Sequence, residues 1–165
     1  MYSKIKICYH NYFAFITVWL GSEEKSAKHF LEAAMLGSSF SQIMIGIRYD
    51  EGRGVNKNNE RSFYWFKEAA KRENIHGLAN VGMSYYHGKG VSKDFKEAFI
   101  WVQKAAEKGD AESQYNLGYM YAVGEGVGKD INLAIKWFKK AKSNKFKKAA
   151  EILDDIYKGT FCDID

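Results

Sequence analysis

Four histidines are the residues of this 165-residue chain best suited to hold a metal ion or move a proton: His10, His29, His76 and His87. Two imidazoles on one helix share a metal when they lie four residues apart, as in H-x-x-x-H or H-E-x-x-H. No two of these histidines have that spacing. His29 also occupies a repeat position that later units fill with tryptophan, so packing explains it. The sequence therefore predicts no metal site, no cofactor and no histidine acting as general base.

Paired carboxylates and cysteines are the next candidates for chemistry. Glu23–Glu24, Asp50–Glu51 and Asp154–Asp155 are adjacent pairs. Neighbouring residues on a helix point in different directions, so these pairs do not form an acid/base site. Cys8 and Cys162 form no C-x-x-C pair, and near opposite ends of the chain they are expected to be free thiols.

The glycine-rich turns superficially resemble phosphate-binding loops. The pattern is G-x-G-V, which lacks the G-K-[ST] ending of a P-loop and follows a predicted helix rather than a strand. We expect these glycines to serve the turn alone. With no convergent acid, base or nucleophile, the sequence predicts a protein that is not an enzyme and has no catalytic residues.

A repeat of 36 residues organises the chain. The G-x-G-V turn starts at Gly52, Gly88 and Gly124, and other residue types keep the same period. They include Trp65, Trp101 and Trp137; Ala33, Ala69, Ala105 and Ala141; and Tyr49, Tyr85, Tyr121 and Tyr157. Such regularity predicts stacked supersecondary units instead of one globular core.

Each unit is predicted to contain two helices. Apolar residues at i, i+3, i+4 and i+7 place the first, called helix A here, near residues 23–36, 59–72, 95–108 and 131–142. Ser22, Asn58, Asp94 and Asp130 stand at their N-caps, and Asp94 with Glu97 suggests a capping box. The second, helix B, carries Leu117, Gly118 and Tyr121 in the third unit.

Glycine inside helix B predicts a close approach. It costs roughly 1 kcal/mol relative to alanine in a helix, yet Gly46, Gly82 and Gly118 keep it in three units. We expect another helix or a tryptophan ring to lie against the backbone there. Each buried tryptophan should contribute about 2–3 kcal/mol to stacking.

The chain ends are expected to act as caps. Residues 4–16 fit a degenerate helix B, with helical spacing of Ile5, Cys8, Tyr9, Tyr12, Phe13 and Ile16 and with His10 in the place of Gly46. The alternative is a signal peptide, with lysines before the apolar run 13–20. His10 and Asn11 interrupt that run, no small-x-small cleavage site follows, and the run is too short to span a bilayer. We therefore favour the cap.

The predicted organisation is a capping helix over residues 1–21, a repeat array over 22–159 and a tail over 160–165. The array divides into units 22–57, 58–93, 94–129 and 130–159. With a capping helix at residues 1–21 we expect a cytoplasmic location. If these residues act as a signal peptide, the expected location is periplasmic or secreted.

These motifs resemble the Sel1-like repeat, a relative of the tetratricopeptide repeat. The pattern A-x-x-x-L-G-x-x-Y-x-x-G-x-G-V followed by A-x-x-W-x-x-K-A-A-x-x-G is seen most fully at residues 113–127 and 98–109. The resemblance implies an all-α, right-handed α/α superhelical solenoid of about four 36-residue helix-turn-helix repeats. It also implies an adaptor or scaffold, often bacterial. A cysteine-rich secreted branch is linked to β-lactam binding, and this chain lacks those cysteines.

Variable positions on helix A are the predicted partner-binding surface, because the resemblance implies that helix A lines the concave side. The candidates are Tyr64, Lys67, Lys71, Ile100, Gln103, Lys104, Lys136, Lys139 and Lys140. The lysine-rich stretch 129–148 is either a solvated cap or a positive patch that attracts an acidic partner. The net charge of +5 mildly favours the acidic partner. Arginine and interleaved exposed aromatics are missing from that stretch, so nucleic acid is not expected.

The predicted function is a non-catalytic protein–protein interaction module, an adaptor or regulator. A specific version is an inhibitor or immunity protein that blocks a bacterial toxin or effector. The alternatives are a hydrolase acting on cell-wall material and a membrane-surface protein tethered by residues 1–20. The oligomeric state is not indicated by any motif.

Overall fold

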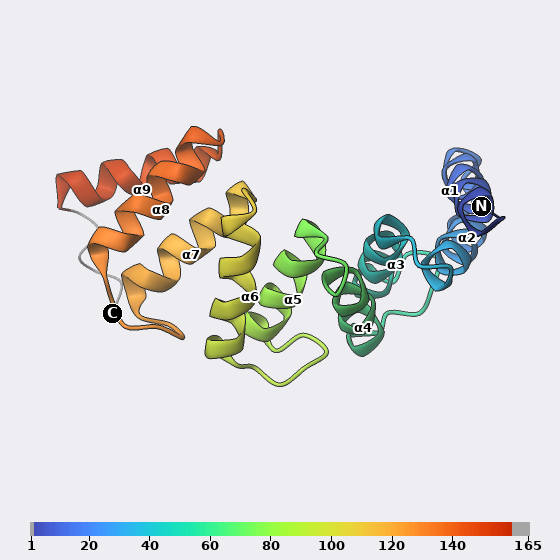
Figure 1. Ribbon diagram of the computed structural model, residues 1–165, viewed down its shortest axis with the longest axis horizontal. Helices are drawn as coiled ribbons and strands as arrows, with labels where there is room; N and C mark the ends of the chain where they lie inside the picture. Colours follow the sequence, from blue (N-terminus) through green and yellow to red (C-terminus); the bar gives the residue numbers. More distant parts are fainter. Residues whose placement is uncertain (1, 160–165) are drawn as a thin grey trace.

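The computed structural model describes residues 2–159, and every regular element in that range is an α-helix (Figure 1). The helices, in order, are α1 (Tyr2–Trp19), α2 (Glu23–Met35), α3 (Ser39–Glu51), α4 (Asn59–Ala70), α5 (Ile75–His87), α6 (Phe95–Glu107), α7 (Ala111–Val123), α8 (Ile131–Ser143) and α9 (Lys147–Lys158). Helices α2, α4, α6 and α8 are the predicted helices A, and their ends lie within about two residues of the prediction. Helices α3, α5, α7 and α9 are the helices B.

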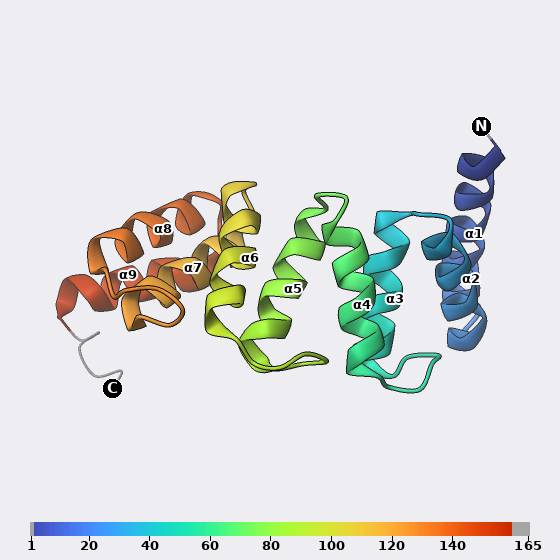
Figure 2. The same ribbon diagram turned by 60° about the horizontal axis from the view of Figure 1, so that its bottom comes forward.

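The helices stack in one row. Each packs mainly on its neighbours in the chain, and α1 and α9 lie at opposite ends of the array (Figures 1 and 2). The buried side chains divide into four clusters along the row, one of them centred on Phe66, Leu78 and Val81. Stability is thus distributed over the stacked units, and the predicted solenoid is confirmed.

Side-chain caps begin most helices, with two departures from prediction. Asn58 Oδ1 accepts a hydrogen bond from Arg61 N (2.8 Å), and Asp130 Oδ1 accepts one from Leu133 N (2.9 Å). Ser22 stands at the N-cap of α2 without a side-chain cap bond. The capping box at Asp94 is half formed: Asp94 Oδ1 accepts a hydrogen bond from Glu97 N (3.1 Å), but the Asp94 N–H donates to Tyr85 O (3.0 Å) and not to the Glu97 carboxylate. That carboxylate accepts a hydrogen bond from Trp101 Nε1 (3.1 Å).

The G-x-G-V turns fold back onto the start of helix A in their own unit. Gly88 ends α5 in the left-handed conformation, with φ of +70°. Gly90 has φ of +70° as well, and a Cβ atom built on it would lie 2.0 Å from the carbonyl oxygen of Asn59. Only glycine combines that backbone conformation with that contact. Gly54 and Gly126 lie equally close to Glu23 O and Phe95 O.

The helix-B glycines admit the residue that follows each tryptophan. A Cβ atom on Gly118 would lie 2.8 Å from the ring of Phe138, and Gly46 and Gly82 stand in the same relation to Phe66 and Val102. The prediction that the tryptophans are buried is wrong, since all three are only half-buried. The next helical position is turned about 100° away and points into the seam between units.

Lysines cover the outer faces of two of these tryptophans. Lys104 Nζ lies 4.6 Å from the Trp101 ring centroid, and Lys140 Nζ lies 4.1 Å from that of Trp137. These are cation–π contacts at equivalent repeat positions. Trp101 and Trp137 therefore lie at the rim of the packing core and not within it.

Helix α1 packs on α2 and covers the first unit, but its predicted apolar stripe is largely exposed. Cys8 is exposed, and so are Ile5, Tyr9 and Tyr12. Only Ala14 and Thr17 are buried among residues 3–19. The covered side of α1 faces α2 and also meets α3, where the Phe15 and Phe40 ring centroids are 5.9 Å apart. Cys162 lies outside the described residues.

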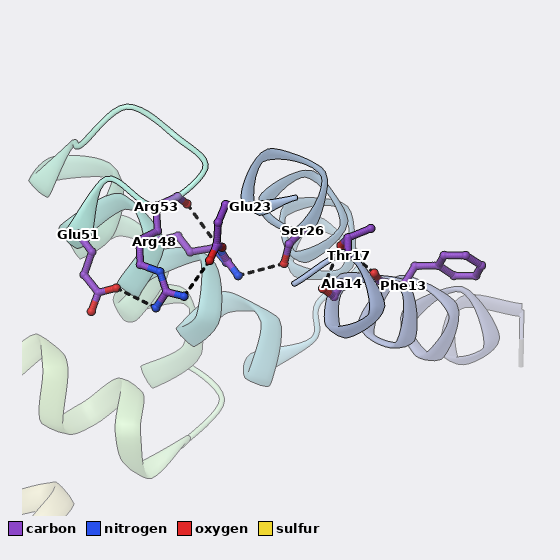
Figure 3. A network of polar contacts seen from close by, with 8 residues as sticks. All are labelled: Phe13, Ala14, Thr17, Glu23, Ser26, Arg48, Glu51 and Arg53. Carbon is purple, nitrogen blue, oxygen red and sulfur yellow. Dashed lines mark hydrogen bonds and ion pairs between the residues drawn. The ribbon is translucent and has the colours of Figure 1, made fainter. Parts of the chain in front are cut away.

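A buried arginine ties α3 to α2 (Figure 3). The Arg48 side chain is 4% exposed; it forms an ion pair with Glu23 and donates a hydrogen bond to Ser26 Oγ (3.0 Å). Arg53 donates a hydrogen bond to the other Glu23 oxygen (3.0 Å). The Arg48 guanidinium also lies 5.2 Å from the Phe30 ring centroid. The network fixes the first G-x-G-V turn to the start of α2.

Neutralising Glu23 should remove a pH-dependent part of the stability. Hydrogen bonds from Arg48 and then Arg53 hold the pKa of the Glu23 carboxyl below its ordinary value of 4.5. The ionised form is therefore favoured by folding, so its contribution is fully present above about pH 4.5 and is lost as the pH falls through the lowered pKa. Glu23 is 39% exposed, so solvent screens the pair and we expect Glu23→Gln to cost about 1 kcal/mol at pH 7.

Urea unfolding of the wild type, Glu23→Gln and Glu24→Gln between pH 3 and pH 7 measures this effect. Glu24 is an exposed neighbour on the same helix and is the matched control. The stability gap between wild type and Glu23→Gln should narrow toward pH 3. A gap that stays constant with pH would contradict a role for the Glu23 charge.

Candidate partner-binding surfaces

The predicted partner-binding residues lie along α4, α6 and α8. Tyr64 and Ile100 are 54% and 44% exposed. The Tyr64 ring meets the Trp65 ring edge-on, at a centroid distance of 5.1 Å. Lys67 Nζ lies 5.7 Å from the Phe63 ring centroid, and Lys71 forms an ion pair with Glu68. Their role in binding remains a prediction.

The remaining predicted residues continue along the same helices. Gln103 Nε2 donates a hydrogen bond to Glu107 (2.8 Å), and Lys104 lies over Trp101. On α8, Lys136 is exposed, Lys139 Nζ lies 6.0 Å from the Tyr157 ring centroid, and Lys140 lies over Trp137. The structure thus gives this side of the array exposed lysines, several of them beside aromatic rings.

A hollow opens on the other side, between two helices B. It encloses about 230 Å³ between α5 and α7, with Val102 of α6 beneath. Its other lining residues are Met83, Tyr86, Tyr115, Asn116, Tyr119 and Met120. Asn116 Nδ2 approaches Met83 Sδ to 3.4 Å and so joins the two walls. This surface was not predicted from the sequence.

A second hollow lies one unit earlier along the same side. It measures about 180 Å³, lies between α3 and α5, and has Phe66 of α4 in its lining. Its lining is more polar, and Lys89 Nζ lies 3.3 Å from the Asp50 carboxylate at its edge. The hollows therefore follow the repeat, each with the buried helix-A residue that faces a helix-B glycine.

The α5–α7 hollow offers hydrogen bonding and apolar contact. Tyr86 Oη donates a hydrogen bond to Glu125 (2.5 Å), and burial, together with that carboxylate, raises the pKa of Tyr86. Burial also raises the pKa of Tyr115. Both phenols stay protonated at neutral pH and act as donors. Tyrosine, methionine, asparagine and valine side chains with these properties suit recognition rather than acid/base chemistry.

Helix-B positions that vary between the repeats could have indicated this hollow from the sequence, whereas the predicted binding surface was taken from helix A alone. Positions 47, 83 and 119 are equivalent and hold isoleucine, methionine and tyrosine. Positions 44, 80 and 116 hold methionine, asparagine and asparagine. Variation at these helix-B positions, beside invariant glycine and tyrosine, indicates side chains that the repeat does not fix. Met44, Ile47 and Tyr119 nevertheless pack at the edge of the buried clusters.

Three polar side chains at the first helix pair also come together. His10 of α1 and His29 and Glu32 of α2 have ligand atoms within 4.8 Å of one another. The prediction of no metal-ligating group relied on spacing along one helix. A cluster shared by two helices depends on how α1 packs on α2, which spacing along one helix does not show.

A known protein family matches this chain over the same repeats. The Sel1 repeat model matches residues 21–38, 39–74, 75–110 and 111–145, which is most of the chain. The chain belongs to the Sel1 repeat family. The last three Sel1 matches each pair a helix B with the helix A that follows it, so they begin at a different point of the same 36-residue period.

Solved Sel1 structures share the fold. The protective antigen c5321 of uropathogenic Escherichia coli is 28% identical, with a TM-score of 0.85 over 99% of this chain and 35% of its own. A Sel1 repeat protein from Oxalobacter formigenes is 29% identical, with a TM-score of 0.79 over 87% of this chain and 57% of its own. Cysteine-rich protein B of Helicobacter pylori is 25% identical, with a TM-score of 0.67 over 81% and 98%.

Two further findings concern curated sequences and membrane-spanning helices. A search of curated protein sequences finds no match to the chain. Within residues 2–159, no helix has the length and apolar character needed to cross a bilayer. Sel1 repeat proteins generally mediate protein–protein interactions, and the solenoid described here has their fold.

Proposed function

We propose that this chain is a protein-binding scaffold whose partner inserts a side chain into the hollow between α5 and α7. The hollow carries the proposal because it combines an apolar floor, Val102, with tyrosine walls at the middle of the array. Tyrosines are enriched among residues that dominate binding energy, and methionine walls adapt their shape to a partner. The fold class supports the protein-binding role, and the hollow supports the location.

The size of the hollow favours a protein side chain over a small molecule. Sites for drug-sized ligands and cofactors enclose about 300–1,000 Å³. At about 230 Å³ the α5–α7 hollow is below that range and matches the space for one large apolar group. We therefore propose that this hollow takes a side chain of a protein partner rather than a cofactor.

The lysine side of the array is proposed as a second contact region. Tyr64 and Ile100 are exposed on adjacent helices A, and Lys136, Lys139 and Lys140 follow on α8. Positive side chains there would speed encounter with an acidic partner. An inhibitor or immunity protein of a bacterial toxin, working in the cytoplasm, is the specific version that we propose for a single acidic partner.

Substitutions in the hollow should weaken partner binding more than substitutions on the lysine side. We expect Tyr119→Ala to lower affinity about tenfold or more, since truncating a central aromatic anchor costs 2 kcal/mol or more. A photo-crosslinking amino acid at position 119, and separately at position 64, identifies the partner in cells. Affinity of the purified partner is then measured by calorimetry for the wild type, Tyr119→Ala, Tyr64→Ala and Tyr157→Ala.

Tyr157 is exposed near the end of the array and is the matched control, with an expected change below about threefold. Thermal unfolding of each variant separates lost binding from lost fold. If Tyr64→Ala weakens binding and Tyr119→Ala does not, the partner lies on the lysine side and the hollow is not its site. If neither position crosslinks to a protein, the scaffold proposal fails.

A further inference from the structure

We propose that His10, His29 and Glu32 form a binding site for a divalent transition-metal ion, with Zn²⁺ the expected occupant. The two imidazoles come from different helices, α1 and α2, and the carboxylate lies one helical turn beyond His29. The site is independent of the proposed partner-binding surfaces. It has two nitrogen ligands and one oxygen ligand, a set that suits zinc and similar ions and does not suit magnesium or calcium.

The three ligand atoms are spaced as a metal would hold them. His10 Nδ1 lies 3.3 Å from His29 Nδ1 and 3.0 Å from Glu32 Oε2, and His29 Nδ1 lies 3.5 Å from the same oxygen. Two ligands about 2.0–2.1 Å from a tetrahedral zinc ion are about 3.3 Å apart. A point close to 2 Å from all three atoms therefore exists, slightly above their plane.

Hydrogen bonding alone leaves this cluster short of protons. A neutral imidazole carries its single N–H on either ring nitrogen, and a carboxylate has none. When both histidines carry that proton on Nε2, the two Nδ1 atoms and Glu32 Oε2 present three lone pairs to one another. A cation between them interacts favourably with all three at once. The side chains are 19%, 23% and 36% exposed, so water reaches the fourth coordination position while the ligands are partly desolvated.

Aromatic neighbours hold the two imidazoles in place. The His29 ring lies 5.8 Å from the Phe13 ring, and the His10 ring lies 5.3 Å from the Tyr9 ring, measured between centroids. Packing that fixes ring orientation lowers the entropy lost when a metal binds. The site thus needs little rearrangement to accept an ion.

Metal binding would fasten α1 to the array. Among residues 3–19 of α1 only Ala14 and Thr17 are buried, although the helix packs along α2. An ion held by His10 on one side and by His29 and Glu32 on the other would join the two helices directly. Binding to the folded state alone also stabilises it, by an amount that grows with metal concentration.

Equilibrium dialysis and calorimetry with Zn²⁺, on protein purified without a histidine tag, test the site. We expect one Zn²⁺ per chain, a rise in melting temperature, and slower amide hydrogen exchange in α1. Mg²⁺ should produce none of these changes. His29→Ala and Glu32→Gln should weaken Zn²⁺ binding by at least the 10- to 100-fold that changes outside the direct ligand set cause.

Matched controls separate this site from other ligands. His87→Ala and Cys8→Ser remove an exposed imidazole and the exposed thiol near His10, and both should bind Zn²⁺ as the wild type does. Glu32→Gln keeps the shape of the side chain, so it remains informative if His29→Ala fails to fold. Unchanged binding in Glu32→Gln and His29→Ala, loss of binding in Cys8→Ser, or no stoichiometric Zn²⁺ binding would each overturn the proposal.

Discussion

Gly90→Ala should destabilise the array by about 2–5 kcal/mol, or prevent its folding. Gly90 has φ of +70°, and an L residue in that region costs roughly 1–2 kcal/mol. Its Cβ atom would also lie 2.0 Å from the carbonyl oxygen of Asn59, so the turn must move away from α4. Overpacking of this kind adds about 1–3 kcal/mol. Urea unfolding followed by circular dichroism measures the sum.

Gly88→Ala is the matched control, because the two glycines differ only in their surroundings. Gly88 also has φ of +70°, but the nearest atom to its Cβ would be Lys93 Cβ, at 3.3 Å. We expect about 1–2 kcal/mol from backbone strain alone. Equal losses for the two variants would show that the contact with Asn59 is unimportant.

Phe138→Ala should cost about 3–5 kcal/mol, as expected for truncating a fully buried phenylalanine. Its side chain is 0% exposed and lies in the space left by Gly118. Removing it leaves a cavity where α7 and α8 meet, in the cluster that also contains Leu153 of α9. Thermal and urea unfolding should show the loss, and hydrogen exchange should show it spread over α7, α8 and α9.

Trp137→Ala tests the corrected packing from the adjacent position. Its ring is half-buried beneath Lys140, so we expect a loss of about 1–2 kcal/mol, below that of Phe138→Ala. A larger loss for Trp137→Ala would restore the tryptophans as the core of the stack.

Local patterns in the sequence were enough to predict the helices, their order and their stacking. The 36-residue period, the polar caps such as Asn58 and Asp130, and the G-x-G-V turns act over a few neighbouring residues. Short-range rules of helix spacing and capping therefore apply to them directly. Because a helix pair with an apolar face needs a neighbour to bury it, repetition also predicted the solenoid.

The contacts between side chains of different helices could not be predicted in this way. Whether Trp137 or Phe138 meets Gly118 depends on the rotation of α8 about its axis, and the two choices differ by one residue. The α5–α7 hollow depends on the distance between α5 and α7, two helices that are not adjacent in the chain. The distances among His10, His29 and Glu32 depend on how α1 lies on α2. Each is set by packing between elements, and intervals along one helix do not specify it.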